Sequence, residues 1–144
     1  TMIADPRLPL ISATGSTRMG KRVNQVVAGR LGRCLLELGG NNAIIVEPDA
    51  NLNLAIPAIV FGATGTAGQR CTTTRRLFLH HTIADQVTAQ LIQAYQNIRI
   101  GDPLDKNNLM GPLINDSACQ RYTQAIEQAL LEIAGRLQQS DTGF

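Results

Sequence analysis

The chain contains short apolar runs and, between most of them, longer stretches in which apolar residues recur every three or four positions. Four of the runs have the length of strands: residues 8–13, 33–38, 43–46 and 76–80. The longer stretches have helical spacing, over 19–31, 52–64 and 83–98 and again after residue 115. Helices that follow the first, third and fourth of these strands predict an α/β fold, with parallel strands at 43–46 and 76–80 and helices packed outside them.

Local signals predict how these helices begin and bend. Asp49 is placed to cap the helix 52–64, and Pro57 inside that helix predicts a kink or a break. Thr82 and Asp85 resemble a capping box at the start of the third helix. The last helix is expected to turn one apolar face inward, made of Tyr122, Ala125, Ile126, Ala129, Leu130 and Ile133.

The composition is that of a globular protein. With 44% hydrophobic residues, 17% charged residues and a net charge of +2, the 144 residues can build one ordinary core and are not a disordered tail. Aromatic residues make up only 3% and do not alternate with the basic ones, so we expect no nucleic-acid partner. No apolar run reaches the roughly 18–20 residues of a membrane helix, and we expect no membrane association.

The cysteines suggest a reducing environment. Cys34, Cys71 and Cys119 are odd in number and far apart, without a CxxC pair or a grouping with histidine. The sequence therefore predicts neither a disulfide framework nor a metal site. A cytoplasmic protein fits this pattern best.

A glycine-containing turn joins the first strand to the first helix. In the stretch from Gly15 to Gly20, small residues precede a helix N-terminus, where free backbone N–H groups and the helix dipole attract phosphate. The spacing also resembles a P-loop, but Arg22 stands where that motif needs Ser or Thr to bind magnesium. The turn is a candidate phosphate site, and its alternatives are a P-loop-like phosphate binder and a turn without a ligand.

Glu37 lies in the otherwise apolar run 33–38, shortly before Gly39 and Gly40. The run predicts a buried strand, in which a carboxylate without a partner is costly. Open α/β sheets place their active sites at the carboxyl ends of strands, which makes Glu37 a candidate general base. The alternative is a glutamate at the sheet edge that points to water.

The stretch from Gly65 to Thr74 places Cys71 at the end of a glycine-spaced turn. A cysteine at such a junction is a candidate nucleophile, although a cysteine is more often a small core residue. His80 and His81 could form a Cys–His hydrolase site with Cys71, but polar residues are normal at a strand end, and we expect both to be bystanders. Neighbours on a strand point to opposite faces, so at most one of the two could serve.

Three motifs taken together are more specific than any one of them. They are Gly15-Ser16-Thr17-x-x-Gly20, Leu36-Glu37-Leu38-Gly39-Gly40-Asn41 and Gly68-Gln69-x-Cys71. Their order, and the step of 34 positions from Glu37 to Cys71, resemble the central signatures of the aldehyde dehydrogenase superfamily. Residues 36–45 and 65–79 more closely resemble its antiquitin-like branch, the α-aminoadipic semialdehyde (piperideine-6-carboxylate) dehydrogenases. The resemblance runs from about residue 8 to residue 137.

This resemblance implies a role for each motif. Cys71 would attack the aldehyde, with its own backbone N–H as half of an oxyanion hole, and Glu37 would activate the water that releases the acid. Five residues would bind the cofactor: Gly15, Ser16 and Gly20 at the pyrophosphate, and Leu38 and Gly39 along the nicotinamide. NAD is the favoured cofactor and NADP the alternative, because the discriminating residues are not in this chain.

Arg70 and Thr72 flank the candidate nucleophile and are expected on the substrate side. Arginine offers a planar, permanently charged fork that matches a carboxylate, and the antiquitin-like branch implies a semialdehyde with a distal carboxylate. The alternative for Arg70 is a pairing with an acid such as Glu37 or with solvent. For the whole chain, the alternative to an aldehyde dehydrogenase is a non-catalytic α/β nucleotide-binding module.

The resemblance also implies an internal piece of a longer chain. Residues 1–40 would be the C-terminal part of a Rossmann-like NAD-binding domain, and residues 41–144 the N-terminal part of the catalytic domain. The full-length protein would be a homodimer or homotetramer. Because a parallel sheet is normally covered on both faces and this piece carries too few elements to do so, we expect the 144 residues alone to be poorly soluble or oligomeric. We also expect them to be inactive, because the resemblance implies that half of the oxyanion hole and most of the ribose site lie outside this chain.

Overall fold

The computed structural model describes the backbone of residues 2–141 and the side chains as far as residue 133. The elements in this range are η1 (Met2–Ala4), β1 (Leu10–Thr14), α1 (Thr17–Ala28), β2 (Arg33–Glu37), β3 (Asn42–Val46), α2 (Leu52–Thr64), η2 (Gly65–Gly68), β4 (Thr74–Leu79), α3 (Ala84–Gln96) and α4 (Asp116–Asp141). The strands pair in parallel, and a helix follows each of β1, β3 and β4, which confirms the predicted α/β class. The chain divides into two compact units, Thr1–Arg99 and Ile100–Phe144, described separately below. The predicted boundary between residues 40 and 41 lies inside the first unit and stays a prediction.

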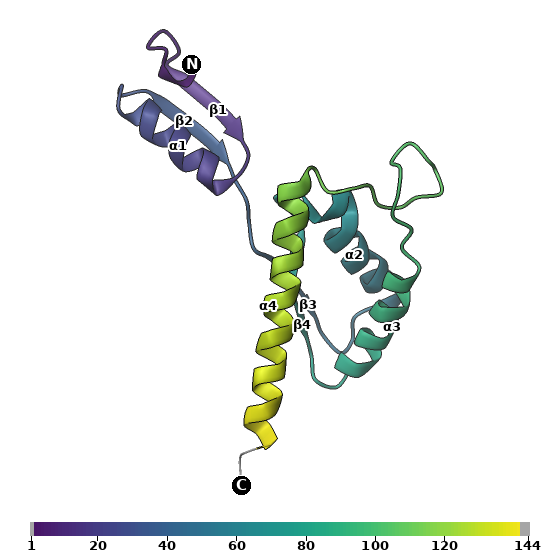
Figure 1. Cartoon of the computed structure of the whole chain (residues 1–144). Helices are drawn as coiled ribbons and strands as arrows, with labels where there is room; N and C mark the ends of the chain where they lie inside the picture. The colour runs from purple at the N-terminus through teal and green to yellow at the C-terminus, as the bar shows by residue number, and fades with distance from the viewer. Residues whose placement is uncertain (1, 142–144) are drawn as a thin grey trace. The chain divides into compact units, whose positions relative to one another are not determined.

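The first layer consists of β1, β2 and α1. The two strands pair in parallel and end with Thr14 beside Glu37. Figure 1 shows α1 lying along this pair. Val23 and Val27 of the helix pack with Ile11 of β1 to form a small buried core. Burial of these branched side chains holds the layer together.

The strand β2 is not buried, contrary to the prediction for residues 33–38. Half-buried and exposed residues alternate along it, and Leu35 is 55% exposed. Burial on both faces needs a layer on each side of the sheet. In the described structure α1 packs on this strand pair from one side, so the other side stays open.

The second layer consists of β3, β4, α2 and α3. Its strands pair in parallel and end with Val46 beside Leu79. The helix α2 packs against both β4 and α3 (Figure 1). Ile59 of α2, Val87 of α3 and Val46 of β3 are the buried apolar residues of this layer.

The helix α2 has the predicted bounds but differs in two details. Its N-cap is Asn51 and not Asp49, because the Asn51 side chain accepts a hydrogen bond from the Asn53 amide at 3.1 Å. The helix also continues through Pro57, so the predicted break does not occur. A proline at the sixth helical position removes one hydrogen bond to the carbonyl of Asn53, which the rest of the helix tolerates.

The predicted capping box of α3 is wrong. The N-cap is Ile83, without a side-chain capping bond, because the Thr82 hydroxyl lies 2.9 Å from His80 Nδ1 instead. The rings of His80 and His81 lie 4.3 Å apart. Both follow the end of β4, so the expectation that they point to opposite faces of a strand is also wrong.

The second unit contains a loop and α4. Ile100 and Met110 form an isolated parallel bridge at the start of the loop. The predicted inward face of α4 is exposed, Tyr122 to 63% and Leu130 to 61%. In the described part of this unit no other helix or strand accompanies α4, so its apolar residues have no layer to pack on. No helix within residues 2–141 combines the length and the apolar composition needed to cross a bilayer.

Candidate active site

The turn between β1 and α1 forms a regular helix N-terminus. Ser16 is the N-cap of α1, and its Oγ accepts a hydrogen bond from the Met19 amide at 3.1 Å. The carbonyl of Ser16 accepts the amide of Gly20 at 2.9 Å. Other amides of the first turn point out of the helix end, in the geometry that binds anions elsewhere.

Residues of the first two sequence motifs, 15–20 and 36–41, lie close together at this helix end. The Gly15 amide donates to the carbonyl of Glu37 at 3.0 Å, which ties the turn to the end of β2. A Cβ built on Gly20 would lie 2.5 and 2.6 Å from the two methyl carbons of Leu38, so Leu38 occupies the space that the glycine leaves. A Cβ on Gly39 would lie 4.0 Å from the Thr17 hydroxyl, also in the first turn of α1. The structure therefore brings the five predicted cofactor residues together.

Glu37 is the last residue of β2, at the carboxyl end of the strand pair, as predicted. Its side chain is exposed in the described structure and not buried. The alternation along β2 explains this, because α1 packs on one side of the pair. A carboxylate at this place is accessible to water and to a ligand at the α1 N-terminus.

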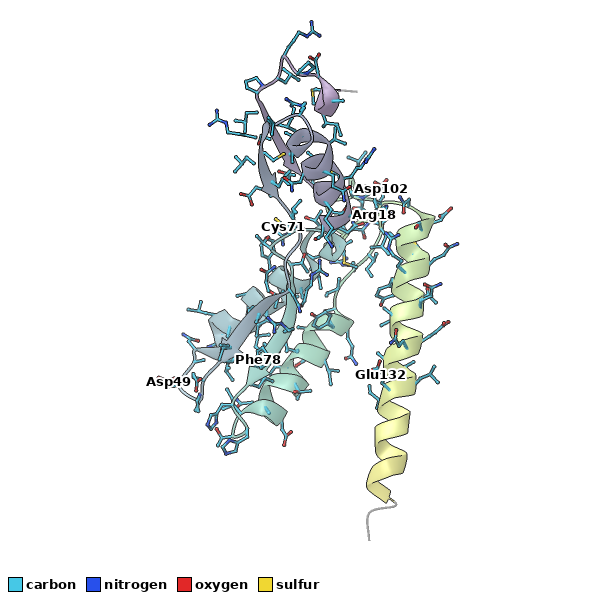
Figure 2. All side chains as sticks on the ribbon, turned by 90° about the vertical axis from the view of Figure 1, so that its left-hand side faces the viewer. Arg18, Asp49, Cys71, Phe78, Asp102 and Glu132 are labelled. Atoms are coloured by element: carbon cyan, nitrogen blue, oxygen red, sulfur yellow. The ribbon has the colours of Figure 1, made fainter. Side chains whose placement is uncertain are left out.

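Cys71 lies at the tip of a tight turn before β4. The Thr73 amide donates to the Arg70 carbonyl at 3.2 Å, and the Arg70 amide donates to Thr73 Oγ1 at 3.1 Å. Thr73 is 4% exposed, whereas Cys71 and Thr72, which lie between Arg70 and Thr73, are exposed. Figure 2 shows Cys71 and Asp49 at opposite ends of the β3–β4 pair. The turn therefore anchors its two ends and presents the thiol.

The residues before this turn have an uncommon backbone. Thr66 and Ala67 have φ of 55° and 52°, and Gly68 continues with 68°. The amide of Gln69 closes this short segment by donating to the Thr66 carbonyl at 3.0 Å. Left-handed φ is unfavourable for residues with a Cβ and often occurs where the surroundings enforce it at functional sites.

Arg70 lies on the end of α2. Its Nη2 donates to the Phe61 carbonyl at 3.1 Å, and its guanidinium carbon lies 4.8 Å from the centre of the Phe61 ring. The guanidinium also covers Gly65 and would have to move to admit a side chain there. In the described structure Arg70 Nε is buried without a hydrogen-bond partner. The side chain thus packs on the helix that leads into the Cys71 turn.

Three polar residues near the site were missed by the sequence analysis. Asn42 Nδ2 donates to the Cys71 carbonyl at 2.6 Å and to the Thr73 carbonyl at 3.1 Å. In the opposite direction, Arg75 and Arg76 donate to backbone carbonyls between β2 and β3. The sequence offered one sign of this arrangement, a second asparagine, Asn42, directly after the motif that ends at Asn41. The residues that it contacts could not be predicted from the sequence.

No group of histidine, cysteine and carboxylate side chains in the described part of the chain could hold a metal ion. The cysteines Cys34, Cys71 and Cys119 are free thiols. The accessible chemistry is therefore that of a thiol on a turn, a carboxylate at a strand end and a helix N-terminus that suits an anion.

Known proteins resemble this chain in both sequence and fold. α-Aminoadipic semialdehyde dehydrogenase of Rattus norvegicus is 53% identical over 91% of the chain, and a putative aldehyde dehydrogenase family 7 member A1 homologue of Caenorhabditis elegans is 49% identical over 99%. Among solved structures, HpcC of Thermus thermophilus superposes with a TM-score of 0.87 at 35% identity over 91% of the chain. Betaine aldehyde dehydrogenase of Staphylococcus aureus, in complex with NAD+, also has a TM-score of 0.87, at 29% identity over 91% of the chain.

The chain spans 24% and 28% of the length of the two sequence relatives and 25% and 26% of the two structures. The aldehyde dehydrogenase family model matches residues 1–142, nearly the full length. The resemblance of the three motifs is thereby confirmed, and the chain belongs to the aldehyde dehydrogenase family.

Proposed function

We propose that the protein of which this sequence forms part oxidises an aldehyde to the corresponding acid, with Cys71 as nucleophile and Glu37 as general base. The observation that carries this proposal is the exposed thiol at the tip of a braced turn, in a chain of the aldehyde dehydrogenase family. A non-catalytic nucleotide-binding module needs neither an accessible thiol nor residues with left-handed φ in front of it.

The chemistry follows from the two side chains. The Cys71 thiolate attacks the carbonyl carbon, a C–S bond forms, and the carbonyl oxygen becomes an oxyanion that the Cys71 amide would stabilise. When this intermediate collapses, the C=O bond forms again and a hydride leaves the carbon, which gives a thioester. Glu37 accepts a proton from the water that attacks the thioester, the C–S bond breaks, and the thiolate returns with release of the acid.

The cofactor we propose is NAD, with NADP as the alternative. The residues fit a dinucleotide: Gly15 and Ser16 are exposed at the start of α1, and Gly20 leaves room for Leu38 against the helix. Gly15, Ser16 and Gly20 would hold the pyrophosphate, and Leu38 with Gly39 would lie along the nicotinamide. The cofactor supplies the acceptor for the hydride.

The substrate class we propose is a semialdehyde with a distal carboxylate, as the name of the rat relative suggests. Thr72 is exposed beside Cys71, on the side where substrate would approach. Arg70 has five N–H donors, of which the Phe61 carbonyl takes one, so a carboxylate could be bound by others. Both residues are proposed to bind substrate.

We further propose a cytoplasmic homodimer or homotetramer. The three cysteines are free, as in a reducing compartment. Several large apolar residues are exposed in the described structure, among them Ile45, Phe78 and Leu130. Exposed apolar surface of this extent favours association with further protein layers.

The nucleophile and the base can be separated by mass spectrometry on the full-length protein. Glu37→Gln should stop at the thioester, so an acyl adduct on Cys71 should accumulate with aldehyde and NAD. Cys71→Ala should lose turnover while its dinucleotide affinity stays within about twofold. Cys119→Ala changes an exposed cysteine of α4 and should behave as wild type. Turnover in Cys71→Ala would contradict the assignment, and magnesium-dependent ATP hydrolysis without nicotinamide reduction would support the P-loop alternative.

A further inference from the structure

Two backbone segments next to the site are joined by hydrogen bonds from side chains in both directions. From one side, Asn42 Nδ2 reaches the carbonyls of Cys71 and Thr73. From the other side, Arg75 Nε donates to the Gly40 carbonyl at 3.1 Å. We call these contacts, together with those of Arg76 to the Asn41 carbonyl, the clasp.

The contacts of Arg76 complete the clasp. Its Nε and Nη2 donate to the same oxygen, the Asn41 carbonyl, at 3.1 and 2.8 Å. Charged donors form stronger hydrogen bonds than neutral ones. The short segment after β2 is therefore bound to the start of β4 through the carbonyl oxygens of Gly40 and Asn41.

A β-bulge creates this arrangement. Asn42 pairs with Thr74, but the next residue, Ala43, pairs with Arg76, so Arg75 is an extra residue in β4. Bulges bend a strand and redirect a side chain. Here the bulge lets both neighbouring arginines reach carbonyls of the same segment, which regular alternation along a strand would prevent.

The amide of Asn42 is suited to its two contacts. An amide nitrogen has two N–H donors, and here two carbonyls accept from it, one from the residue before Thr72 and one from the residue after it. A Cβ on Gly40 would lie 3.2 Å from the Cys71 carbonyl oxygen, so the two segments approach closely at this point. Aspartate at position 42 would face these oxygens with oxygens of its own.

We propose that Asn42 is a positioning residue, which fixes the peptide plane of Cys71 and thereby the direction of the thiol. The proposal rests on the function proposed above. It also links the two reacting side chains, because Asn42 follows Glu37 by five positions and contacts the Cys71 peptide directly. A small movement of either segment would change the approach of the nucleophile, and misplacement by about 1 Å can cost about 100-fold in rate.

The test uses the full-length protein with propanal and NAD, and measures the single-turnover rate of NADH formation. Asn42→Ala should lower this rate about 10- to 100-fold, with the dinucleotide dissociation constant within about twofold of wild type. Asn41→Ala is the matched control, because it removes a neighbouring amide side chain and keeps the carbonyl that Arg76 binds. Its rate should stay within about twofold of wild type.

A pH profile separates positioning from a general loss of stability. In the variant Asn42→Asp, the ionised carboxylate has no donor, but the protonated carboxyl can donate one hydrogen bond. The rate of this variant relative to wild type should therefore rise as the pH falls toward the ordinary pKa of aspartate, about 3.9. A ratio that does not change with pH would contradict the proposal.

A second readout does not depend on catalysis. In Asn42→Ala, the Thr73 amide, which closes the Cys71 turn, should exchange with deuterium about tenfold faster than in wild type. Faster exchange in a protein without aldehyde oxidation would support the positioning role and reject the proposed function. Normal exchange and a normal rate in Asn42→Ala would reject the positioning role alone. If Asn42→Ala does not fold, Arg75→Ala removes the contact to Gly40 and should accelerate the same exchange; unchanged exchange there would overturn the proposal.

Discussion

Glu37 and Cys71 are held in place by two different kinds of structure. Glu37 ends a regular strand, pairs with Thr14 in register, and accepts the Gly15 amide through its carbonyl. Cys71 belongs to no strand or helix. One backbone hydrogen bond, from the Thr73 amide to the Arg70 carbonyl, closes its turn, and the Thr73 and Asn42 side chains hold it further. The proposed general base must lie within hydrogen-bond reach of the water that it activates, whereas the proposed nucleophile also needs a defined direction of attack on the carbonyl carbon.

The regular part of the molecule could be predicted from the sequence. Hydrophobic periodicity located four strands and gave the bounds of α2, and the rule for carboxyl ends of strands located Glu37. The exposure of β2 could not be predicted, because it depends on which layers accompany the strand. The same is true of α4, whose apolar residues are exposed in the described structure.

The surroundings of Cys71 could be predicted only in part. Glycine spacing indicated a turn, but Thr66 and Ala67 are not residues that signal left-handed φ. The rule for strand ends does not apply either, because Cys71 precedes its strand and so lies at the amino end of the β3–β4 pair. The clasp depends on a bulge and on the register of two strands about 30 positions apart, which no local pattern encodes.

Among three further substitutions, at Gly20, Arg70 and Ala67, the largest effect is expected at Gly20, in the regular region. Gly20→Val would push a branched side chain into the methyl groups of Leu38. Overpacking of this kind costs about 1–3 kcal/mol, and dinucleotide affinity should fall about tenfold or more as the start of α1 moves. Denaturant unfolding and fluorescence titration with NADH would measure the two effects on the full-length protein.

The double variant Gly20→Val/Leu38→Ala is the control for this clash. It removes the methyl groups that the valine meets, so it should recover part of the lost stability relative to Gly20→Val. If the losses of stability from the two substitutions simply add, Leu38 does not limit the space at Gly20. The regular region around Glu37 would then tolerate change better than expected.

A smaller effect is expected at Arg70, and it tests which region selects the substrate. Arg70→Ala should raise the apparent KM for a carboxylate-bearing semialdehyde about tenfold, which is about 1.4 kcal/mol. The apparent KM for propanal should change little. The contact with the Phe61 carbonyl offers the competing role, a brace for the turn. Equal losses on both aldehydes in steady-state kinetics would mean that Arg70 supports the Cys71 turn and does not choose the substrate.

The smallest effect is expected at Ala67, in the left-handed segment before the turn. A left-handed conformation costs a residue with a Cβ about 1–2 kcal/mol, while glycine loses about 0.4–1 kcal/mol more to the freedom of the unfolded chain. Ala67→Gly should therefore stabilise the protein slightly, by about 0.5 kcal/mol. The same replacement in the right-handed helix α2, Ala58→Gly, should destabilise it by about 0.8–1.0 kcal/mol. Opposite signs in denaturant unfolding would confirm the strain.

The single-turnover rate of Ala67→Gly then shows what holds the turn. If the clasp and Arg70 define the position of Cys71, glycine keeps the same backbone path and the rate should stay within about twofold of wild type. A tenfold slower reaction in this more stable variant would mean that the stiffness of Ala67 itself directs the nucleophile. In that case the left-handed segment, and not the contact from Asn42, would distinguish the region of Cys71 from that of Glu37.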